Sequence, residues 1–137
     1  MFAVKLFPAQ ARLLIVGRSF WDVPEAERFY EDVRVALLRW GPSRPLRVYA
    51  DLTEHDLQDS GVSEVNARTA ALLRAAPIDR YALVIPHALL RLQARRLLES
   101  VDYRIFGSPA EAAEWLVWPI DDLTREVEAT REAVPVH

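Results

Sequence analysis

The chain alternates between two hydrophobic periods, one typical of β-strands and one typical of α-helices. Apolar or alternating runs predict strands over residues 2–7, 12–16, 46–52, 81–85 and 103–106. Apolar residues spaced three and four apart predict helices over residues 22–40, 62–76, 87–100 and from residue 108. Strands that alternate with helices of this length form mostly parallel sheets with right-handed crossovers. The pattern therefore predicts an α/β fold with about five strands, four or five helices and an N-terminal antiparallel hairpin.

Capping residues mark where the predicted helices begin. Asp22 and Ser108 each precede a Glu by three residues, which is the capping-box spacing. Ser60 or Ser63 is the expected cap of the helix that follows the third strand, because a serine side chain accepts a hydrogen bond from the first-turn amides.

Length, composition and charge indicate one domain without disulfides. The sequence has 137 residues, which suits a single domain; we expect it to span residues 1–118, followed by an acidic tail over 119–137 that forms at most a short helix and frays at its end. The net charge of −3 gives no general attraction to nucleic acid. The absence of cysteine excludes disulfides and thiol catalysis.

No signal-peptide pattern and no apolar run of about 20 residues is present, so we expect a cytoplasmic protein without an integral membrane segment.

Motifs for known cofactors, metals and catalytic centres are missing from the sequence. The four glycines fall at element boundaries, so no glycine-rich nucleotide loop can be built from them. The three histidines, His55, His87 and His137, share no metal-ligand spacing. We therefore assign no catalytic residue, no cofactor and no metal from the sequence.

A resemblance to a known family is carried by the helix with Ala26, Glu27 and Phe29 and by four segments in this order along the chain: RLLIVGRSFW at 12–21, RVYADL at 47–52, YALVI at 81–85 and YRIFGSPAEAAEWL at 103–116. They resemble the bacterial SpoIIAA-like (STAS-like) family of small proteins. The resemblance covers about residues 1–118 and implies a STAS-like fold. It also implies a domain without enzymatic activity, and ligand or lipid binding has been suggested for such proteins.

The richest polar stretch, DLTEHDLQDSGVS at residues 51–63, has several interpretations. In antagonists of the SpoIIAA type, a serine in a turn at the comparable place is phosphorylated, which makes Ser60 a candidate phosphorylation site by resemblance. The match is incomplete, and a helix cap is the preferred role for Ser60. The carboxylates around His55 have the composition of a metal site, but their spacing matches no known loop, so a solvated acidic loop is preferred.

Six residues are candidate ligand contacts: Trp21, Asp51, His87, Arg91, Arg95 and Trp118. Asp51 ends a parallel strand, at the edge where open α/β sheets bind their ligands. Arg91 and Arg95 lie one helical turn apart and have the chemistry to hold an anion, with a solvated helix face as the preferred alternative. His87 opens a helix, where a polar cap is preferred over a catalytic role. The two tryptophans stand at element junctions, where they line a pocket, an interface or the core.

Three functions remain open at this point. The preferred hypothesis is a non-enzymatic STAS-like domain that binds a protein partner and itself as a homodimer. The alternative is a carrier of a small apolar or lipid-like ligand held between sheet and helices. An enzyme that uses Asp51, His55 or His87 ranks last.

Overall fold

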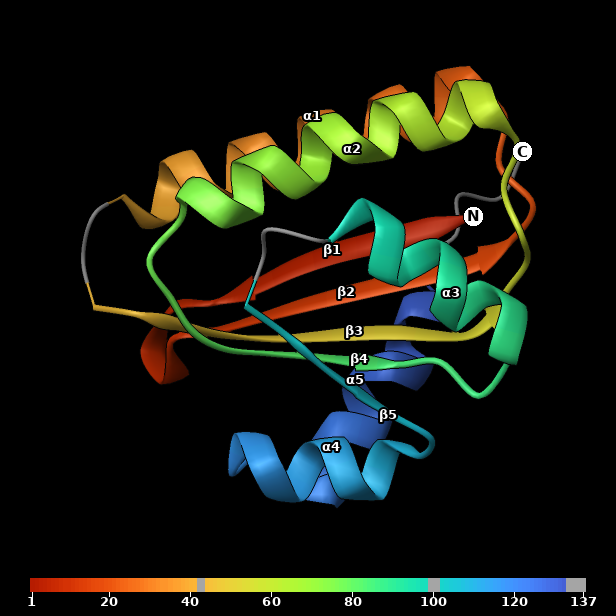
Figure 1. The fold of residues 1–137 in the computed structure, drawn as a ribbon. Helices are drawn as coiled ribbons and strands as arrows, with labels where there is room; N and C mark the ends of the chain where they lie inside the picture. The colour runs from red at the N-terminus through yellow and green to blue at the C-terminus, as the bar shows by residue number, and fades with distance from the viewer. Residues whose placement is uncertain (42–43, 99–101, 133–137) are drawn as a thin grey trace.

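The computed structural model describes residues 1–41, 44–98 and 102–132 as a single α/β sandwich (Figure 1). Its strands are β1 (Phe2–Phe7), β2 (Arg12–Ser19), β3 (Leu46–His55), β4 (Ile78–Val84) and β5 (Arg104–Phe106). Its helices are α1 (Val23–Trp40), α2 (Ser60–Ala75), α3 (Ala88–Leu97), α4 (Pro109–Leu116) and α5 (Ile120–Glu132), with a short 3₁₀ helix η1 (Pro8–Gln10) between the first two strands.

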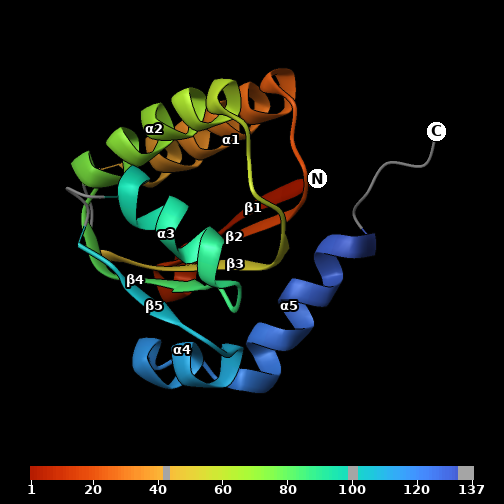
Figure 2. The same cartoon turned by 45° about the vertical axis from the view of Figure 1, so that its right-hand side comes forward.

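The five strands form one sheet in the order β1-β2-β3-β4-β5. Strand β1 pairs with β2 in the antiparallel direction, and the other neighbours are parallel. The predicted mixed sheet with its N-terminal hairpin is therefore confirmed. Helices α1, α2 and α3 cover one face of the sheet, and α4 and α5 cover the other (Figures 1 and 2).

Both faces of the sheet bury apolar side chains, so the core has two parts. Along β2, Leu13 and Ile15 pack against α1–α3, whereas Leu14 and Val16 pack against α4 and α5. Successive residues of a strand point to opposite faces, which explains why the central strands read as unbroken apolar runs.

Several element boundaries differ from the sequence-based prediction: β2 ends at Ser19 rather than Val16, and β4 begins at Ile78 rather than Tyr81. Strand β3 continues to His55, three residues beyond the predicted end, because Glu54 and His55 still pair with β2 across a bulge. Helix α2 begins at Ser60, and its cap is Asp59, whose carboxylate accepts a hydrogen bond from the Val62 amide at 2.9 Å. The expectation that Ser60 or Ser63 caps this helix is therefore wrong; the aspartate side chain reaches the first-turn amides from one position earlier.

The segment after residue 118 forms a helix that shares the core of the rest of the chain. Leu123 of α5 is 1% exposed and belongs to the apolar cluster beneath α4 and α5. The expected fraying concerns residues 133–137, including His137, which lie outside the described residues, as do residues 99–101 at the predicted end of the third long helix. Within the described residues, no helix is long and apolar enough to cross a membrane.

Candidate functional site

A cavity of about 100 Å³ lies between the sheet and helices α1, α2 and α3. No residue that lines it is an aspartate, glutamate, lysine or arginine. The lining residues are Ile15, Trp21, Phe29, Ala50, Leu52, His55, Gln58, Asn66, Thr69, Ala70, Leu73, Tyr81, Leu83, Leu90, Gln93, Ala94, Leu97 and Leu98. Mainly apolar walls with a few polar groups are typical of small-molecule sites.

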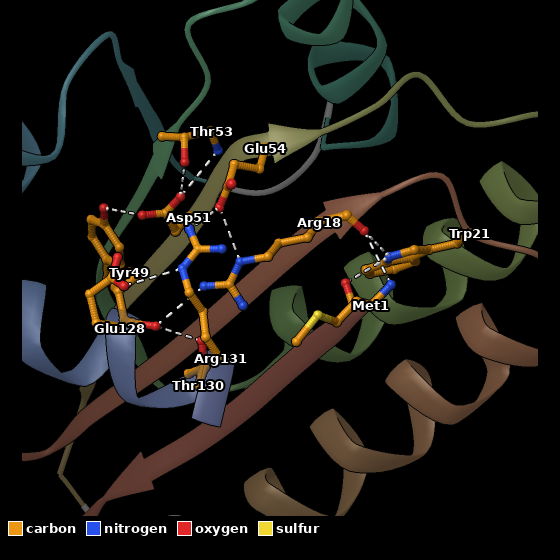
Figure 3. Close-up of polar contacts among 11 residues, drawn as sticks. Met1, Arg18, Trp21, Tyr49, Asp51, Thr53, Glu54, Glu128, Thr130 and Arg131 are labelled. Carbon is orange, nitrogen blue, oxygen red and sulfur yellow. Dashed lines mark hydrogen bonds and ion pairs between the residues drawn. The ribbon is translucent and has the colours of Figure 1, made fainter. Parts of the chain in front are cut away.

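Trp21 forms an aromatic wall of this cavity. It is 2% exposed, and its ring lies 5.0 Å from the Phe29 ring and 4.7 Å from the His55 ring, centroid to centroid. The indole Nε1 donates to the backbone carbonyls of Met1 and Arg18 at 3.0 and 3.1 Å (Figure 3). These bonds satisfy the polar end of the side chain, so the rest of the ring remains available as an apolar wall.

His55 reaches the cavity because β3 contains a bulge. Val16 pairs with Asp51 and Arg18 pairs with Glu54, so β3 has one more residue than β2 over this stretch. The extra residue reverses the alternation of side chains, which puts His55 on the opposite face from Asp51. The His55 ring lies close to the backbone of β2, because a Cβ atom added to Gly17 would be 3.1 Å from His55 Nδ1.

The electrostatic state of His55 is set by its burial. Removal from water, and then the positive charge of the N-terminal amino group, lower the pKa of the imidazole from 6.5 to about 4. The ring is therefore neutral near pH 7.

Three polar atoms of the lining residues are buried without a hydrogen-bond partner. They are His55 Nδ1, Asn66 Oδ1 and Thr69 Oγ1; the one other such side-chain atom among the described residues is Nη1 of Arg18. A buried polar group without a partner costs roughly 1–3 kcal/mol, and most buried groups in folded proteins have one. All three belong to residues that line the same cavity.

Reciprocal hydrogen bonds connect the rim of the cavity to α3. The backbone amide of Gln58 donates to Gln93 Oε1 at 3.1 Å, and Gln93 Nε2 donates to the Gln58 carbonyl at 2.8 Å. The Gln58 side chain in turn accepts from the Trp21 amide at 2.8 Å and donates to the Ser19 and Asp56 carbonyls. Gln58 therefore links the loops that follow β2 and β3 with α3.

Asp51 lies on the opposite face of the sheet, under α5. It is 5% exposed, accepts from the Tyr49 hydroxyl at 2.9 Å, and accepts from the Thr53 amide and hydroxyl at 3.1 and 2.7 Å (Figure 3). Burial, and then the negative charge of Asp51, raises the pKa of the Tyr49 hydroxyl, so Tyr49 stays protonated. Both carboxylate oxygens are thus engaged by groups of the same strand.

An ion-pair cluster beside Asp51 connects α5 to the sheet. Arg18 Nε donates to Glu54 Oε2 at 3.2 Å and Arg18 Nη2 to the Val127 carbonyl at 3.3 Å, while Arg131 pairs with Glu54 and, at 3.2 Å, with Glu128 (Figure 3). A hydrogen bond from Arg131 lowers the pKa of Glu54 most, followed by that from Arg18. The polar stretch 51–63 therefore places side chains on both faces of the sheet. Among the described residues, no group of three or more metal-ligating side chains is found.

The remaining candidate residues are scattered. Ser60 is exposed at the first position of α2, and His87 caps α3 by accepting from the Leu90 amide at 3.3 Å. Arg91 donates to the carbonyl of Ile85, whereas Arg95 is exposed. Trp118 is 3% exposed but packs with Phe7 and Tyr49 on the α4 and α5 face. Of the six candidate ligand contacts, Trp21 alone lines the cavity.

A row of arginines was not recognised in the sequence analysis. Arg12, Arg47 and Arg80 occupy paired positions on β2, β3 and β4 and donate to the carbonyls of residues 115–117, at the end of α4. Arg80 and Arg104 also lie over the Trp115 ring, at 5.3 and 5.0 Å. These cations satisfy helix-end carbonyls that have no partner within the helix. The sequence contains a signal for this row, because an arginine precedes the apolar run of every parallel strand.

The polar residues of the cavity were also missed as a group. Thr69 stands within the apolar stripe of its helix, and Asn66 lies one turn before it. Two polar residues at this spacing on the buried side of a helix were the available signal for a polar site. The spacing alone does not show that a cavity lies next to them.

No protein-family model and no curated protein matches the chain. Among solved structures, it is similar to an uncharacterised protein of the DUF3478 family from Shewanella loihica PV-4, which is described as having a SpoIIAA-like fold. The identity is 17% over 84% of this chain and 93% of that one, with a TM-score of 0.65.

The chain has a SpoIIAA-like fold. The NMR structure of the protein TM1081 is also similar, with 19% identity, a TM-score of 0.59, and coverage of 85% of this chain and 88% of that one. These likenesses confirm the architecture that the four sequence segments implied, and they concern the fold alone.

Proposed function

We propose that this SpoIIAA-like domain is a non-enzymatic binding protein that holds a small, mainly apolar molecule between the sheet and helices α2 and α3. The observation that carries the proposal is the apolar cavity with three unpartnered polar atoms among its lining side chains. Such a cavity gains both apolar contact and hydrogen bonds when a ligand enters.

The absence of catalysis is part of this proposal. An active site needs a nucleophile or base in hydrogen-bond reach of a partner that activates it. Among the described residues, His55 has no hydrogen-bonded carboxylate, and the buried carboxylate of Asp51 is occupied on the other face of the sheet. The local chemistry therefore favours binding.

The size of the cavity limits the ligand. An apolar protein cavity of about 150 Å³ binds benzene, so a cavity of about 100 Å³ accepts at most a single ring or a short branched chain. A long acyl chain would fit only if α3 moved away from the sheet. The structure thus favours a smaller ligand than the lipid suggested by the family resemblance.

Benzene tests this proposal directly. We expect saturable binding of benzene in ¹⁵N–¹H correlation spectra, with the largest shifts in α2 and α3. The variant Ala70→Leu fills the cavity from α2 and should abolish these shifts, whereas Ala67→Leu on the exposed side of the same helix should leave them unchanged. Equal shifts in both variants, or no binding of any small apolar compound, would refute the proposal.

Self-association is a second proposal, supported by exposed apolar side chains near the rim. Leu57, Leu89 and Leu92 are 41%, 58% and 46% exposed and flank the contact between Gln58 and Gln93. Exposed apolar groups that gather in one area mark interaction surfaces. Sedimentation equilibrium is the test: a homodimer that Leu89→Glu dissociates would support the proposal, and a monomer at all concentrations would remove it.

A further inference from the structure

We infer that the cavity selects a neutral molecule that carries a hydroxyl group on a compact apolar body, such as a phenol or a cyclic alcohol, and that Asn66 and Thr69 bind this hydroxyl. The inference rests on the proposed function, because it names the class of ligand that the same cavity accepts.

Two of the unpartnered polar atoms belong to side chains of α2. Asn66 and Thr69 are three residues apart, a spacing that brings their Cβ atoms to about 5–6 Å on one side of a helix. Asn66 Oδ1 can only accept a hydrogen bond, and the Thr69 hydroxyl can donate one. A single hydroxyl between them would donate to Asn66 and accept from Thr69, so both unpartnered atoms would be satisfied by one ligand group.

The walls of the cavity carry no side chain that is charged near pH 7. None of the residues that line the cavity is an aspartate, glutamate, lysine or arginine, and the His55 ring is neutral near pH 7 since burial lowers its pKa to about 4. The N-terminal amino group is already paired with Glu25 at 2.7 Å. A carboxylate or an ammonium group would lose its water without gaining an opposite charge, which is strongly unfavourable. The lining therefore excludes fatty acids and other small anions.

The apolar part of the lining combines small and aromatic side chains. Ala50, Ala70 and Ala94 leave space that larger side chains would fill, and Trp21 and Phe29 supply flat aromatic walls. Aromatic walls favour offset or edge-to-face contact with a ring. A six-membered ring with one hydroxyl therefore offers a flat apolar body to these walls and one polar group to Asn66 and Thr69.

Calorimetric titration with phenol, benzene and benzoate at pH 7.5 tests the inference. The three compounds share one ring and differ in their polar group. We expect phenol to bind about fivefold or more tightly than benzene, because it adds hydrogen bonds to otherwise unpaired groups, and we expect no measurable binding of benzoate. Benzoate that binds as tightly as phenol would overturn the inference.

Variants of Thr69 separate a binding role from a structural one. Thr69→Val has nearly the same shape but no hydroxyl, so the preference for phenol over benzene should fall by about fivefold. Thr69→Ser keeps the hydroxyl and should keep most of the preference. Thr124→Val is the matched control, because it removes an exposed threonine hydroxyl on α5.

The outcomes distinguish the inference from the proposed function. If none of the three compounds binds, the proposed function fails together with the inference. If benzene and phenol bind equally and Thr69→Val has no effect on their ratio, the inference fails and the proposed function stands.

Discussion

The two faces of the sheet treat their buried polar groups in opposite ways. Under α4 and α5, Asp51 accepts three hydrogen bonds from Tyr49 and Thr53, and the buried Arg18 donates to Glu54 and to the Val127 carbonyl. Under α1–α3, three polar atoms have no partner, and the cavity lies among their side chains. Arg18 Nη1 is the exception on the first face, although the other guanidinium nitrogens of Arg18 are bonded.

This contrast indicates which face is complete without a ligand. A fully bonded polar network rigidifies the structure around it, whereas a partly satisfied one is costly unless something completes it. Under the proposed function, the face covered by α4 and α5 acts as a scaffold face, and the face covered by α1–α3 is the cavity face that would hold the ligand. The bulge in β3 separates the two roles, because it directs Glu54 to the scaffold and His55 to the cavity.

The largest effect is expected when a substitution breaks the hydrogen-bond network around Asp51 on the scaffold face. Asp51→Ala leaves the buried Tyr49 hydroxyl and the Thr53 donors without an acceptor, so we expect the free energy of unfolding to fall by about 3–4 kcal/mol. Asp51→Asn retains an acceptor for Thr53 and should lose about half as much. Urea denaturation followed by circular dichroism measures both values. Similar small losses in the two variants would show that this network does not stabilise the fold.

The next effect concerns His55 on the cavity face and depends on pH. Folding lowers the pKa of His55 from 6.5 to about 4, so as pH falls the unfolded chain binds a proton before the folded chain does. The stability that neutral His55 provides is complete above pH 6.5 and is lost between pH 6.5 and 4. We expect wild type to lose on the order of 2–3 kcal/mol more than His55→Gln between pH 7.5 and 4.5. Parallel pH curves for the two proteins would contradict a neutral, buried His55.

The sequence predicted the architecture well because periodicity reports which face of an element is buried. The apolar runs of β2 and β4 located the central strands, and the capping box at Asp22 located α1, where the Asp22 carboxylate accepts from the Glu25 amide at 2.8 Å. These are local signals, and they need no knowledge of the neighbouring elements.

The site was less predictable because it depends on register and on contacts between distant segments. A one-residue bulge decides that Asp51 and His55 point to opposite faces, and nothing in the stretch 51–63 marks that bulge. The bond between Gln58 and Gln93 joins residues 35 positions apart. For the two candidate tryptophans, the sequence left pocket, interface and core open; Trp21 lies beside the cavity, whereas Trp118 packs beneath α4 and α5.

The smallest effects are expected from removing one buried hydroxyl group on each face of the sheet. On the cavity face, Thr69→Val deletes a buried oxygen that has no partner, so the ligand-free protein should gain about 1 kcal/mol in free energy of unfolding. On the scaffold face, Tyr49→Phe deletes a hydroxyl that donates to Asp51, so stability should fall by about 1 kcal/mol. Thermal and urea unfolding of both variants, without added ligand, gives the two signs. A loss in both would mean that Thr69 already has a partner in the ligand-free protein, and the cavity face would then be as complete as the scaffold face.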